Sequence, residues 1–563
     1  MYATRPTLSG PRHAVSAGHY LASTAAMAVL EAGGNAIDAG CAAGMALGVL
    51  LPDLVNVAGV APIMIRLADG TVETIAGLGH WPRSLPPDVF MREHGGKIPN
   101  GVRRTVVPAA PDAWITALER HGTMGFGDVA QYAIRYAAEG FAVYPLLAET
   151  VALHRDEYAR WPSNAAIFLP GGEPPVVGTR FVQSDLARTL SCMVAEEQRA
   201  AATGGRMAGL AAAHAAFYRG DIAREIVRFI QAEGGFLSME DMAGFRSRLE
   251  PAVARRWLLT CGPWCQGPAL AQALLLMERA GFEGMAHNSA GYLHLLTECV
   301  KAAMADREYH FGDPLFTQVP LDALLSPQHL DARLRQIDPD RAHPSMYEPL
   351  LGVGTPADGP VRADPPKVEA DTSYVAVVDR WGNAFSATPS DGSWNSPVVP
   401  GLGLIPSNRG SQSRPDPAHP SGVAPGKRPR LTPNPAMLVT EDGGVMPFGT
   451  PGGDVQIQAM LQVMLNVFHF GMELQEAIEA PRIASYAFPS SFAPFDYFPG
   501  RVAAEARIPQ AVRDGLAARG HEGRRWPEMT WLAGSVGAVL SAPPAGLVRA
   551  GADPRRPAYA IAG

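Results

Sequence analysis

A β-hairpin predicted at residues 371–388 is the feature that most constrains this chain. Its sequence, DTSYVAVVDRWGNAFSAT, holds Tyr, Val and Phe residues that favour a pleated, half-buried surface, and Gly382-Asn383 supplies the turn. The preceding residues 339–366 are dense in Pro, Gly, Asp and Ala and show no apolar period, so the sequence predicts a loose loop there. Any fold of this chain must therefore place a strand that starts directly after a long irregular segment.

The junction between this loop and the hairpin has two interpretations. Cleavage before Thr372 would free the hydroxyl and the α-amino group of one residue, as a self-cleaving precursor requires. An α-amino group has a pKa of roughly 7.7–8.0, which suits a general base, so this chemistry needs no histidine. The alternative is an ordinary loop that enters an ordinary hairpin, and this stretch by itself favours that alternative.

The size and charge of the chain limit its partners. Its 563 residues are 47% hydrophobic, which is enough for one large core or for two domains. A net charge of -7 argues against nucleic-acid binding, which needs a clustered basic surface. The compact basic run at residues 427–430 lies among Pro and Gly residues, and we interpret it as a loop that pairs with carboxylates. We therefore expect a small-molecule partner and no nucleic acid.

Signals for targeting and for metal binding are weak. Residues 1–13 lack the apolar core of a secretory signal, and the longest apolar run, residues 41–52, is too short to span a bilayer. Five scattered cysteines fit a reducing compartment, so we expect a cytoplasmic protein with no membrane partner. Cys261 and Cys265 lie four apart without a matching His or Cys pair, so the sequence predicts no metal site and no cofactor.

The order of the predicted elements indicates layers of helices and sheets. Gly33-Gly34-Asn35 opens a helix to about Leu51, and Ser289 caps a long helix whose apolar residues recur at a spacing near 3.6. Strands and turns dominate after Thr372, and this order favours layered α and β structure over alternating βαβ units. Further helices are predicted at residues 111–120, 128–139, 184–202, 212–218, 222–233 and 455–468, and a further hairpin at residues 63–75.

Gly452 and Gly453 are the best candidates for an oxyanion site. Two glycines let backbone N–H groups approach a reacting carbonyl, and this pair precedes a helix whose N-terminal end favours negative charge. One such donor typically contributes about 2.7–4 kcal/mol of barrier lowering. A Pro-Gly-Gly turn that simply starts a helix is the commoner meaning of such a motif taken alone.

Three other polar residues each have two possible roles, one structural and one in the active site. Ser390 either ends the second strand of the hairpin or hydrogen-bonds the nucleophile. Arg409 is either a surface loop residue or a bidentate clamp on a substrate carboxylate, and Asp454 either caps the helix or orients a substrate donor. Residues 396–435 are rich in Pro, Gly and Ser, and a long irregular stretch inside a compact domain favours a lid or pocket wall over a linker.

Taken together, these segments resemble the gamma-glutamyltransferase family of N-terminal-nucleophile hydrolases. No single segment decides the resemblance, but it covers nearly the whole chain and keeps the order of the family, which makes it specific. The segments are GGNAIDA at residues 33–39, HGTM at 121–124, AEGF at 138–141, FYRG at 217–220, YLHLL at 292–296, ADR at 305–307, GDP at 312–314, DT at 371–372, VVD at 377–379, GNA at 382–384, GKRP at 426–429 and GTPGG at 449–453.

The resemblance implies an α+β fold, a four-layer αββα sandwich, and self-cleavage of the precursor before Thr372. Residues 1–371 would then form the large-subunit part of one domain, and residues 372–563 the small-subunit part. Both chains would stay in one globule, with homodimerisation left open. The loop at residues 339–366 would become a new tail that must leave the pocket after cleavage.

The matched positions keep the catalytic residues of the family and lose most of its substrate clamp. Gly452 and Gly453 match the oxyanion glycines, and Ser390 matches a hydroxyl that contacts the nucleophile. In true gamma-glutamyl enzymes an arginine grips the α-carboxylate of glutamate, and here that position is Leu78, with Arg83 displaced nearby. The other clamp positions, which hold two serines, an asparagine and an acidic group in the family, fall at Leu431, Thr432, Gly392, Ser411 and Gln412.

Two segments resemble the amidohydrolase branch of the family more closely. They are the tripeptide at residues 408–410 and the tetrapeptide at residues 451–454, and that branch includes oxamate amidohydrolase and acylase-like members. A small amide-acid or an acyl amide therefore suits this chain better than glutathione. The residues expected to bind substrate are Asn408, Arg409, Thr432 and Asp454.

Three hypotheses follow for the activity. The first is an autoprocessed hydrolase or acyltransferase that forms an acyl-enzyme on Thr372 from a small amide or acyl amide. The second is a true gamma-glutamyl (glutathione) hydrolase or transferase whose clamp uses Arg83 or Arg409. The third is an unprocessed relative that binds a small ligand without catalysis. The retained threonine and glycine pair, together with the lost clamp, favour the first, but the sequence names neither the acyl group nor its acceptor.

Overall fold

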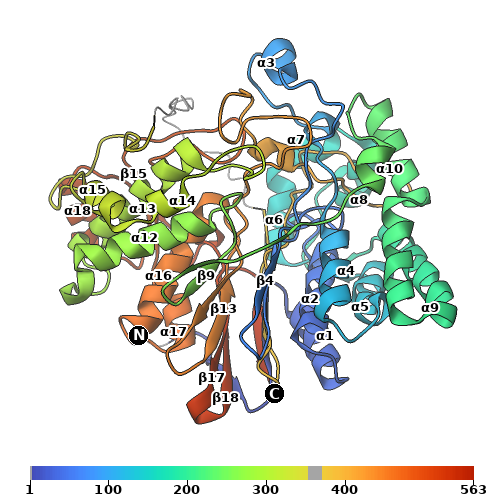
Figure 1. Cartoon of the computed structure of the whole chain (residues 1–563), viewed down its shortest axis with the longest axis horizontal. Coiled ribbons are helices and arrows are strands. Elements are labelled where there is room, and N and C mark those ends of the chain that lie inside the picture. Colours follow the sequence, from blue (N-terminus) through green and yellow to red (C-terminus); the bar gives the residue numbers. More distant parts are fainter. Residues whose placement is uncertain (1–2, 353–370) are drawn as a thin grey trace.

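Two seven-stranded antiparallel sheets face each other at the centre of the molecule, and helices cover both outer faces (Figure 1). The structure is a computed structural model that describes residues 3–352 and 371–563. The sheet that contains the strand after Thr372, here called the β10 sheet, has the order β19-β2-β10-β11-β3-β4-β7. The other, called the β13 sheet, has the order β1-β18-β17-β13-β12-β9-β8.

Each sheet combines strands from before and after Thr372. The β10 sheet consists of β19 (Tyr559–Ala562), β2 (Ala14–Ala17), β10 (Val375–Val378), β11 (Ala384–Ala387), β3 (Ile63–Arg66), β4 (Val72–Ile75) and β7 (Leu249–Glu250). The β13 sheet consists of β1 (Leu8–Gly10), β18 (Leu547–Ala552), β17 (Gly537–Ala542), β13 (Val445–Gly449), β12 (Ala436–Val439), β9 (Leu258–Thr260) and β8 (Val253–Arg255).

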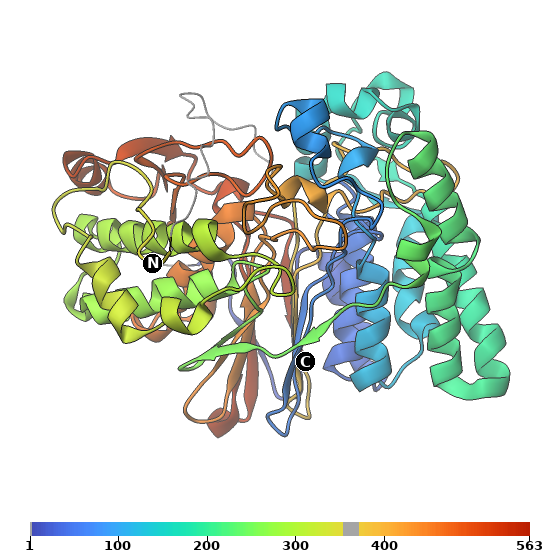
Figure 2. The same ribbon diagram turned by 45° about the horizontal axis from the view of Figure 1, so that its top comes forward.

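Helices form the two outer layers, on opposite sides of the paired sheets (Figure 2). The layer on the β10 sheet contains α1 (Tyr20–Glu31), α2 (Ala36–Leu50), α4 (Ala110–His121), α5 (Phe126–Glu139), α9 (Ser184–Tyr218) and α10 (Asp221–Ala232). The layer on the β13 sheet contains α12 (Gly267–Ala280), α13 (Ala290–His310), α15 (Pro327–Leu334), α16 (Gln456–Phe468), α17 (Leu474–Glu479) and α18 (Gln510–Ala518). The expected αββα sandwich is confirmed. In the part of the chain that the structure describes, no helix is long and apolar enough to cross a membrane.

Shorter elements connect these layers. The helices are α3 (Val89–His94), α6 (Pro145–Leu153), α7 (Arg155–Ala159), α8 (Pro162–Phe168), α11 (Met239–Ala243) and α14 (Leu321–Leu324). A three-stranded sheet has the order β14 (Ile483–Ser485), β15 (Arg501–Glu505) and β16 (Glu522–Trp526), and β5 (Phe141–Ala142) pairs with β6 (Arg180–Phe181).

Capping groups set the ends of the helices as the sequence predicts. The Asn35 side chain accepts hydrogen bonds from the N–H groups of Ile37 and Asp38, and Asp38 accepts one from Asn35 N–H at 3.0 Å, so α2 begins with a full capping box. Ser289 Oγ accepts the N–H of Tyr292 and begins α13.

Glycines explain two features of the helical layers. Gly205 has φ of 72° and breaks α9 into two segments, which is why the sequence predicts two helices there. Helix α2 is buried along its whole length, and a Cβ added at Gly40 or Gly44 would overlap the rings of Phe385 or Trp114. The small residues of α2 therefore let it lie directly on the β10 sheet.

The predicted hairpin is confirmed, with β10 and β11 joined by a turn in which Gly382 has φ of 92°. Asp379 fixes the turn, because its carboxylate accepts the N–H groups of Trp381 and Asn383 at 2.9 Å. Asp379 also accepts Ala36 N–H at 2.9 Å, which connects the turn to the start of α2. The hairpin is therefore tied to the helical layer that covers its sheet.

Two long irregular segments lie after α15 and after β11. Residues 339–352 contain no helix or strand, and residues 353–366 of the predicted loop lie outside the described residues. Residues 396–435 are irregular apart from one short 3₁₀ turn, Arg409–Gln412, and most of them are buried, so they do not form an exposed linker. Their role as a lid or pocket wall stays a prediction. In the basic run, Arg428 pairs with Asp313 and Glu250 at 2.8 Å, as predicted.

Candidate active site

Thr372 lies buried three residues before the start of β10, and its hydroxyl faces polar atoms. Its N–H donates to Leu54 C=O at 2.8 Å, and its Oγ1 lies 2.5 Å from Ser390 Oγ and 3.1 Å from Asp371 Oδ1. A φ of 100° is unusual for a β-branched residue and implies strain of about 1–3 kcal/mol. The structure therefore places a strained backbone conformation directly after the junction, at the residue that carries the hydroxyl.

Ser390 lies between the nucleophile candidate and a buried arginine. Its N–H donates to Val60 C=O at 3.0 Å, which fixes the chain just beyond β11. Arg409 Nη2 donates to Ser390 Oγ, so the Ser390 hydroxyl proton is available to Thr372 Oγ1. Thr372 then donates to Asp371, whose carboxylate accepts from Arg409, and the four residues close a ring of hydrogen bonds.

Arg409 is fully buried and holds the side chain of the residue before the junction. Its Nη2 lies 2.6 Å from Asp371 Oδ2, and its Nε lies 3.8 Å from Asp391 Oδ1. Nε and Nη1 make no hydrogen bond within the described residues. The Phe492 ring covers the guanidinium, with 5.7 Å between the Arg409 Cζ and the ring centroid. A buried guanidinium is stable only with an anionic partner, and Asp371 supplies the closest one.

Asp391 and Asn408 shape the loop around this arginine. Asp391 has φ of 133°, its carboxylate accepts Ser407 O–H at 2.6 Å and Asn408 N–H at 3.2 Å, and burial raises its pKa to about 6. The Asn408 amide donates to Gly392 C=O at 2.7 Å. Gly392 N–H in turn donates to Asp371 Oδ2 at 3.3 Å, so Asn408 acts on the junction through Gly392.

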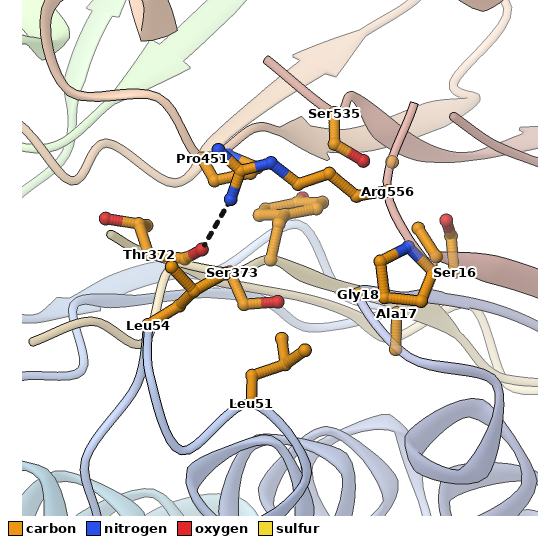
Figure 3. Close-up of a pocket in the computed structure, with 14 residues that line it drawn as sticks. Ser16, Ala17, Gly18, Leu51, Leu54, Thr372, Ser373, Pro451, Ser535 and Arg556 are labelled. Atoms are coloured by element: carbon orange, nitrogen blue, oxygen red, sulfur yellow. Dashed lines mark hydrogen bonds between the residues drawn. The ribbon is translucent and has the colours of Figure 1, made fainter. Parts of the chain in front are cut away.

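The glycine pair leads into α16 through the short 3₁₀ turn Gly453–Val455. Gly452 and Gly453 have φ of 125° and 57°, conformations that favour glycine. Among the described residues, neither glycine N–H has a hydrogen-bond partner, and Pro451 lines the same cavity as Thr372 (Figure 3). The two glycines directly follow Pro451, which lies beside Thr372, and an oxyanion site must also lie beside the nucleophile.

A small cavity beside Thr372 has about 10 Å³ of space for the centre of a water molecule, which is room for about one water. Arg556 reaches this cavity and donates to Thr372 C=O at 3.4 Å (Figure 3). Burial lowers the pKa of Arg556 to about 10, and nearby Asp53 partly opposes that shift. Arg556 thus places a positive charge on the carbonyl side of Thr372.

Asp53 is a fully buried carboxyl next to Leu54, whose carbonyl holds Thr372 N–H. Neither oxygen has a hydrogen bond of good geometry within the described residues, and burial raises the Asp53 pKa to about 7. The charge of Arg556 lowers it again in part. Asp53 therefore changes its charge near neutral pH, close to the junction.

Two of the expected substrate-binding residues are bonded to other protein groups. Thr432 Oγ1 accepts a hydrogen bond from Gln412 Nε2 at 3.1 Å. Asp454 accepts from Gln266 Nε2 and Ser491 Oγ, both at 2.6 Å, and its side chain does not cap α16. Their roles toward substrate stay predictions.

The position of the family's arginine clamp holds a buried leucine, and the arginine near it lies on the surface. Leu78 is buried in the core between the sheets. Arg83 is more than half exposed and pairs with Glu240 at 3.7 Å on the surface. A clamp built on Arg83 would need this segment to move, whereas Arg409 is already in place.

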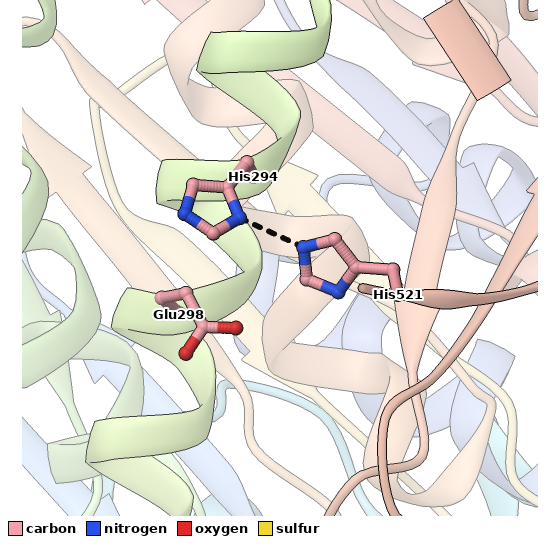
Figure 4. Close-up of side chains that lie close together, drawn as sticks. All are labelled: His294, Glu298 and His521. Carbon is pink, nitrogen blue, oxygen red and sulfur yellow. Dashed lines mark hydrogen bonds between the residues drawn. The ribbon is translucent and has the colours of Figure 1, made fainter. Parts of the chain in front are cut away.

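His294, Glu298 and His521 lie close enough together to be tested as a metal site (Figure 4). His294 Nδ1 lies 2.8 Å from His521 Nε2, and both Glu298 oxygens are already bonded, by Lys301 Nζ at 2.9 and 3.2 Å and by Tyr347 O–H at 2.5 Å. A buried ammonium on the same carboxylate opposes a divalent cation. These side chains fit a hydrogen-bond network between α13 and the chain after α18 rather than a metal centre.

Sequence reasoning missed the partners that complete the site. The sequence pattern points to Asp371 only as the residue before the junction, and it does not select Arg556 or Asp53. Asp53 follows directly on the apolar run at residues 41–52, and a charged residue beside such a run is a signal of a buried partner that could have identified it. Arg556 lies among other charged residues, Asp553 and Arg555, so the sequence holds no comparable signal for it.

Comparison with known proteins identifies the family of this chain. Residues 22–563 match the family model described as Gamma-glutamyltranspeptidase. The acylase ACY 1 proenzyme of Pseudomonas sp. (strain SE83) is 32% identical, over 95% of this chain and 91% of its own. The glutathione hydrolase proenzyme of Bacillus subtilis (strain 168) is 29% identical, over 90% and 84%.

Solved structures extend the similarity to the whole fold. LmbA2991HD superposes with a TM-score of 0.92 at 36% identity and covers 100% of both chains. The cephalosporin acylase from Bacillus halodurans superposes with a TM-score of 0.84 at 28% identity, over 100% of this chain and 98% of its own. The family match, the shared sandwich and the buried threonine junction agree, and the chain belongs to the gamma-glutamyltranspeptidase family of enzymes.

Proposed function

We propose that this chain is the precursor of a threonine-nucleophile amide hydrolase that cuts itself between Asp371 and Thr372. The observation that carries the proposal is the hydrogen-bonded ring of Thr372, Ser390, Arg409 and Asp371 around the strained junction. The relatives support processing, because the acylase and glutathione hydrolase relatives are both proenzymes.

Self-cleavage would use the groups already in contact. Thr372 Oγ1 attacks the carbonyl carbon of Asp371, an ester bond forms, the peptide C–N bond breaks, and the hydroxyl proton ends on the released nitrogen. Relief of the Thr372 backbone strain favours this step. Water then hydrolyses the ester and leaves Thr372 with a free hydroxyl and a free α-amino group.

Turnover of an external amide would repeat the same chemistry. The α-amino group of Thr372 takes the hydroxyl proton as Oγ1 attacks the substrate carbonyl, and the amine product leaves an acyl-enzyme that water hydrolyses. The free N–H groups of Gly452 and Gly453 would bind the oxyanion, and Ser390 would hold Oγ1 in position. The substrate class is a small amide or an acyl amide.

A second candidate is gamma-glutamyl hydrolysis or transfer, which the glutathione hydrolase relative favours. The buried Leu78 and the surface position of Arg83 argue against a glutamate clamp of the usual kind. Assay of the processed protein with a gamma-glutamyl anilide separates the candidates. Absence of turnover, in a preparation that hydrolyses another acyl amide, removes the second.

Mass analysis of the purified protein tests the proposal directly. We expect two chains, residues 1–371 and 372–563, with Thr372 as the new N-terminus. Thr372→Ala should stay a single chain, whereas the control Thr440→Ala, in the turn between β12 and β13, should be processed normally. A wild-type protein that remains one full-length chain under all conditions of expression and storage would sink the proposal.

A further inference from the structure

The residue that the nucleophile must release in self-cleavage is itself held by a built carboxylate site. Three donors converge on the Asp371 side chain: Arg409 Nη2 at 2.6 Å, Gly392 N–H at 3.3 Å and Thr372 O–H at 3.1 Å. The side chains of Arg409 and Thr372 are fully buried, and Asp371 itself is 4% exposed. Water therefore cannot easily replace the carboxylate, and the protein supplies the solvation of its charge.

The ester that self-cleavage forms is chemically an acyl-enzyme. Its acyl group is the aspartyl group of residue 371, joined through the backbone carbonyl to Thr372 Oγ1. The side-chain carboxylate of that acyl group is separated from the reacting carbonyl by two carbons, Cα and Cβ. Hydrolysis of this ester and hydrolysis of a substrate acyl-enzyme are thus the same reaction on the same oxygen.

Departure of Asp371 would leave Arg409 without its nearest anion. The other carboxylate near it, Asp391, lies 3.8 Å from Nε and is occupied by Ser407 and Asn408. Nε and Nη1 already make no hydrogen bond within the described residues, and Nη2 would keep only Ser390 Oγ. A fully buried guanidinium with these donors open favours an incoming carboxylate.

From these contacts we propose that the mature enzyme acts on amides of four-carbon dicarboxylic acids, in which the acyl group carries a carboxylate two carbons from the scissile carbonyl. Succinyl amides are the simplest members of this class. The substrate carboxylate takes the place of the Asp371 carboxylate on Arg409 and Gly392 N–H, while its carbonyl takes the place of the carbonyl of residue 371 at Thr372 Oγ1. This inference rests on the proposed Thr372 acyl-enzyme.

The fixed distance between Arg409 and Thr372 makes the site selective for chain length. A malonyl group is one carbon too short to reach Arg409 from the ester, and a glutaryl or gamma-glutamyl group is one carbon too long. A butanoyl group fits the length but leaves the guanidinium unpaired. Hydrogen bonds to charged groups contribute about 1.5–3 kcal/mol, so each mismatch should lower kcat/KM by about 10- to 150-fold.

Hydrolysis of a matched series of p-nitroanilides by the processed enzyme tests the inference. The series carries succinyl, malonyl, glutaryl, gamma-glutamyl and butanoyl groups, and release of p-nitroaniline gives kcat/KM for each. We expect the succinyl compound to exceed every other by at least about tenfold. Succinate should also inhibit the enzyme and raise its melting temperature more than butanoate does, which is a readout independent of turnover.

Variants locate the effect on one residue. Arg409→Met should reduce the succinyl-to-butanoyl ratio to about one, whereas Arg83→Met, on the surface, should leave it unchanged. Arg409→Met could also stop self-cleavage. The inference is therefore tested first on the wild-type enzyme, by the p-nitroanilide series and by the succinate measurements, which do not need this variant. Equal or faster hydrolysis of the butanoyl, glutaryl or gamma-glutamyl compound overturns the inference and leaves the Thr372 acyl-enzyme standing. A protein with no chain starting at Thr372 and no turnover of any compound overturns both.

Discussion

Replacement of Asp371 by asparagine should slow self-cleavage without changing the shape of the junction. The carboxylate accepts a 2.6 Å bond from Arg409 and also accepts the Thr372 hydroxyl proton at 3.1 Å. Both contacts keep the hydroxyl and the scissile bond in the reactive arrangement. Asp371→Asn keeps the size of the side chain and removes its charge, so it tests the ion pair itself.

The contacts give the expected magnitude. A hydrogen bond to a charged group contributes about 1.5–3 kcal/mol and a neutral one about 0.5–1.5 kcal/mol, so the substitution loses about 1–1.5 kcal/mol of orientation at the Arg409 contact alone. Each 1.4 kcal/mol is a factor of ten in rate, which gives about a 5- to 12-fold slower reaction. Loss of the charged acceptor for the Thr372 proton adds to this slowing.

Cell-free synthesis followed by a timed chase measures the effect. Samples quenched in denaturant are separated by size, and the loss of full-length chain gives the first-order rate constant. Asp442→Asn, an exposed aspartate in the turn between β12 and β13, is the matched control and should process at the wild-type rate. Asp371→Glu, which keeps the charge one carbon further out, should fall between the two. An Asp371→Asn rate within twofold of wild type would refute the role of the ion pair.

Three further predictions concern the nucleophile, the oxyanion site and the buried carboxyl. Ser390→Ala should lower kcat of the processed enzyme by about 10-fold or more with little change in KM, because Thr372 Oγ1 loses its 2.5 Å partner. Alanine at position 452 keeps the backbone N–H, but a side chain at φ of 125° strains the turn and displaces this donor, so Gly452→Ala should lower kcat by up to about 10²–10³-fold, the cost of losing one oxyanion donor. Gly443→Ala, at φ of 84° in an exposed turn, should cost only stability. Burial raises the Asp53 pKa to about 7, so the free energy of unfolding of the wild type falls as pH rises from about 4 to 7. The melting temperature of Asp53→Asn should therefore exceed that of the wild type by a larger margin at pH 8 than at pH 5. Equal margins at the two pH values would contradict this.

Local signals in the sequence identified several of the longer helices and two hairpins, but not most of the strands. The Gly-Asn turn after β10, the Ser289 cap of α13 and the start of α2 at Gly33-Gly34-Asn35 each act through neighbours in the chain, and each prediction is confirmed. The order of the strands in each sheet could not be predicted from local signals. Strand β2 lies between β19 and β10, more than 300 residues away along the sequence, and no local pattern encodes that pairing.

The candidate site likewise contains residues that local sequence signals identify and residues that only the complete fold brings into place. Thr372, Ser390 and the glycine pair belong to a hairpin and a turn that have sequence signatures. Arg409 lies in an irregular stretch, and its ion pair with Asp371 depends on how that stretch folds back over the junction. The sequence left Arg409 as either a surface residue or a substrate clamp. The structure buries it beside Asp371, and that burial depends on the whole fold and not on neighbouring residues.

The interleaved sheets have a consequence for how the processed protein would behave. Strands β10 and β11 lie between β2 and β3, and β1 pairs with β18, so each sheet contains strands of both fragments. The native fragments could not separate on dilution, since separation would open both sheets. After complete unfolding, however, recovery would need two different molecules to meet, and the exposed strand edges would favour aggregation first. Before cleavage, a single unfolded chain could refold by itself. After cleavage, the time for which the protein stays native would be set by its rate of unfolding.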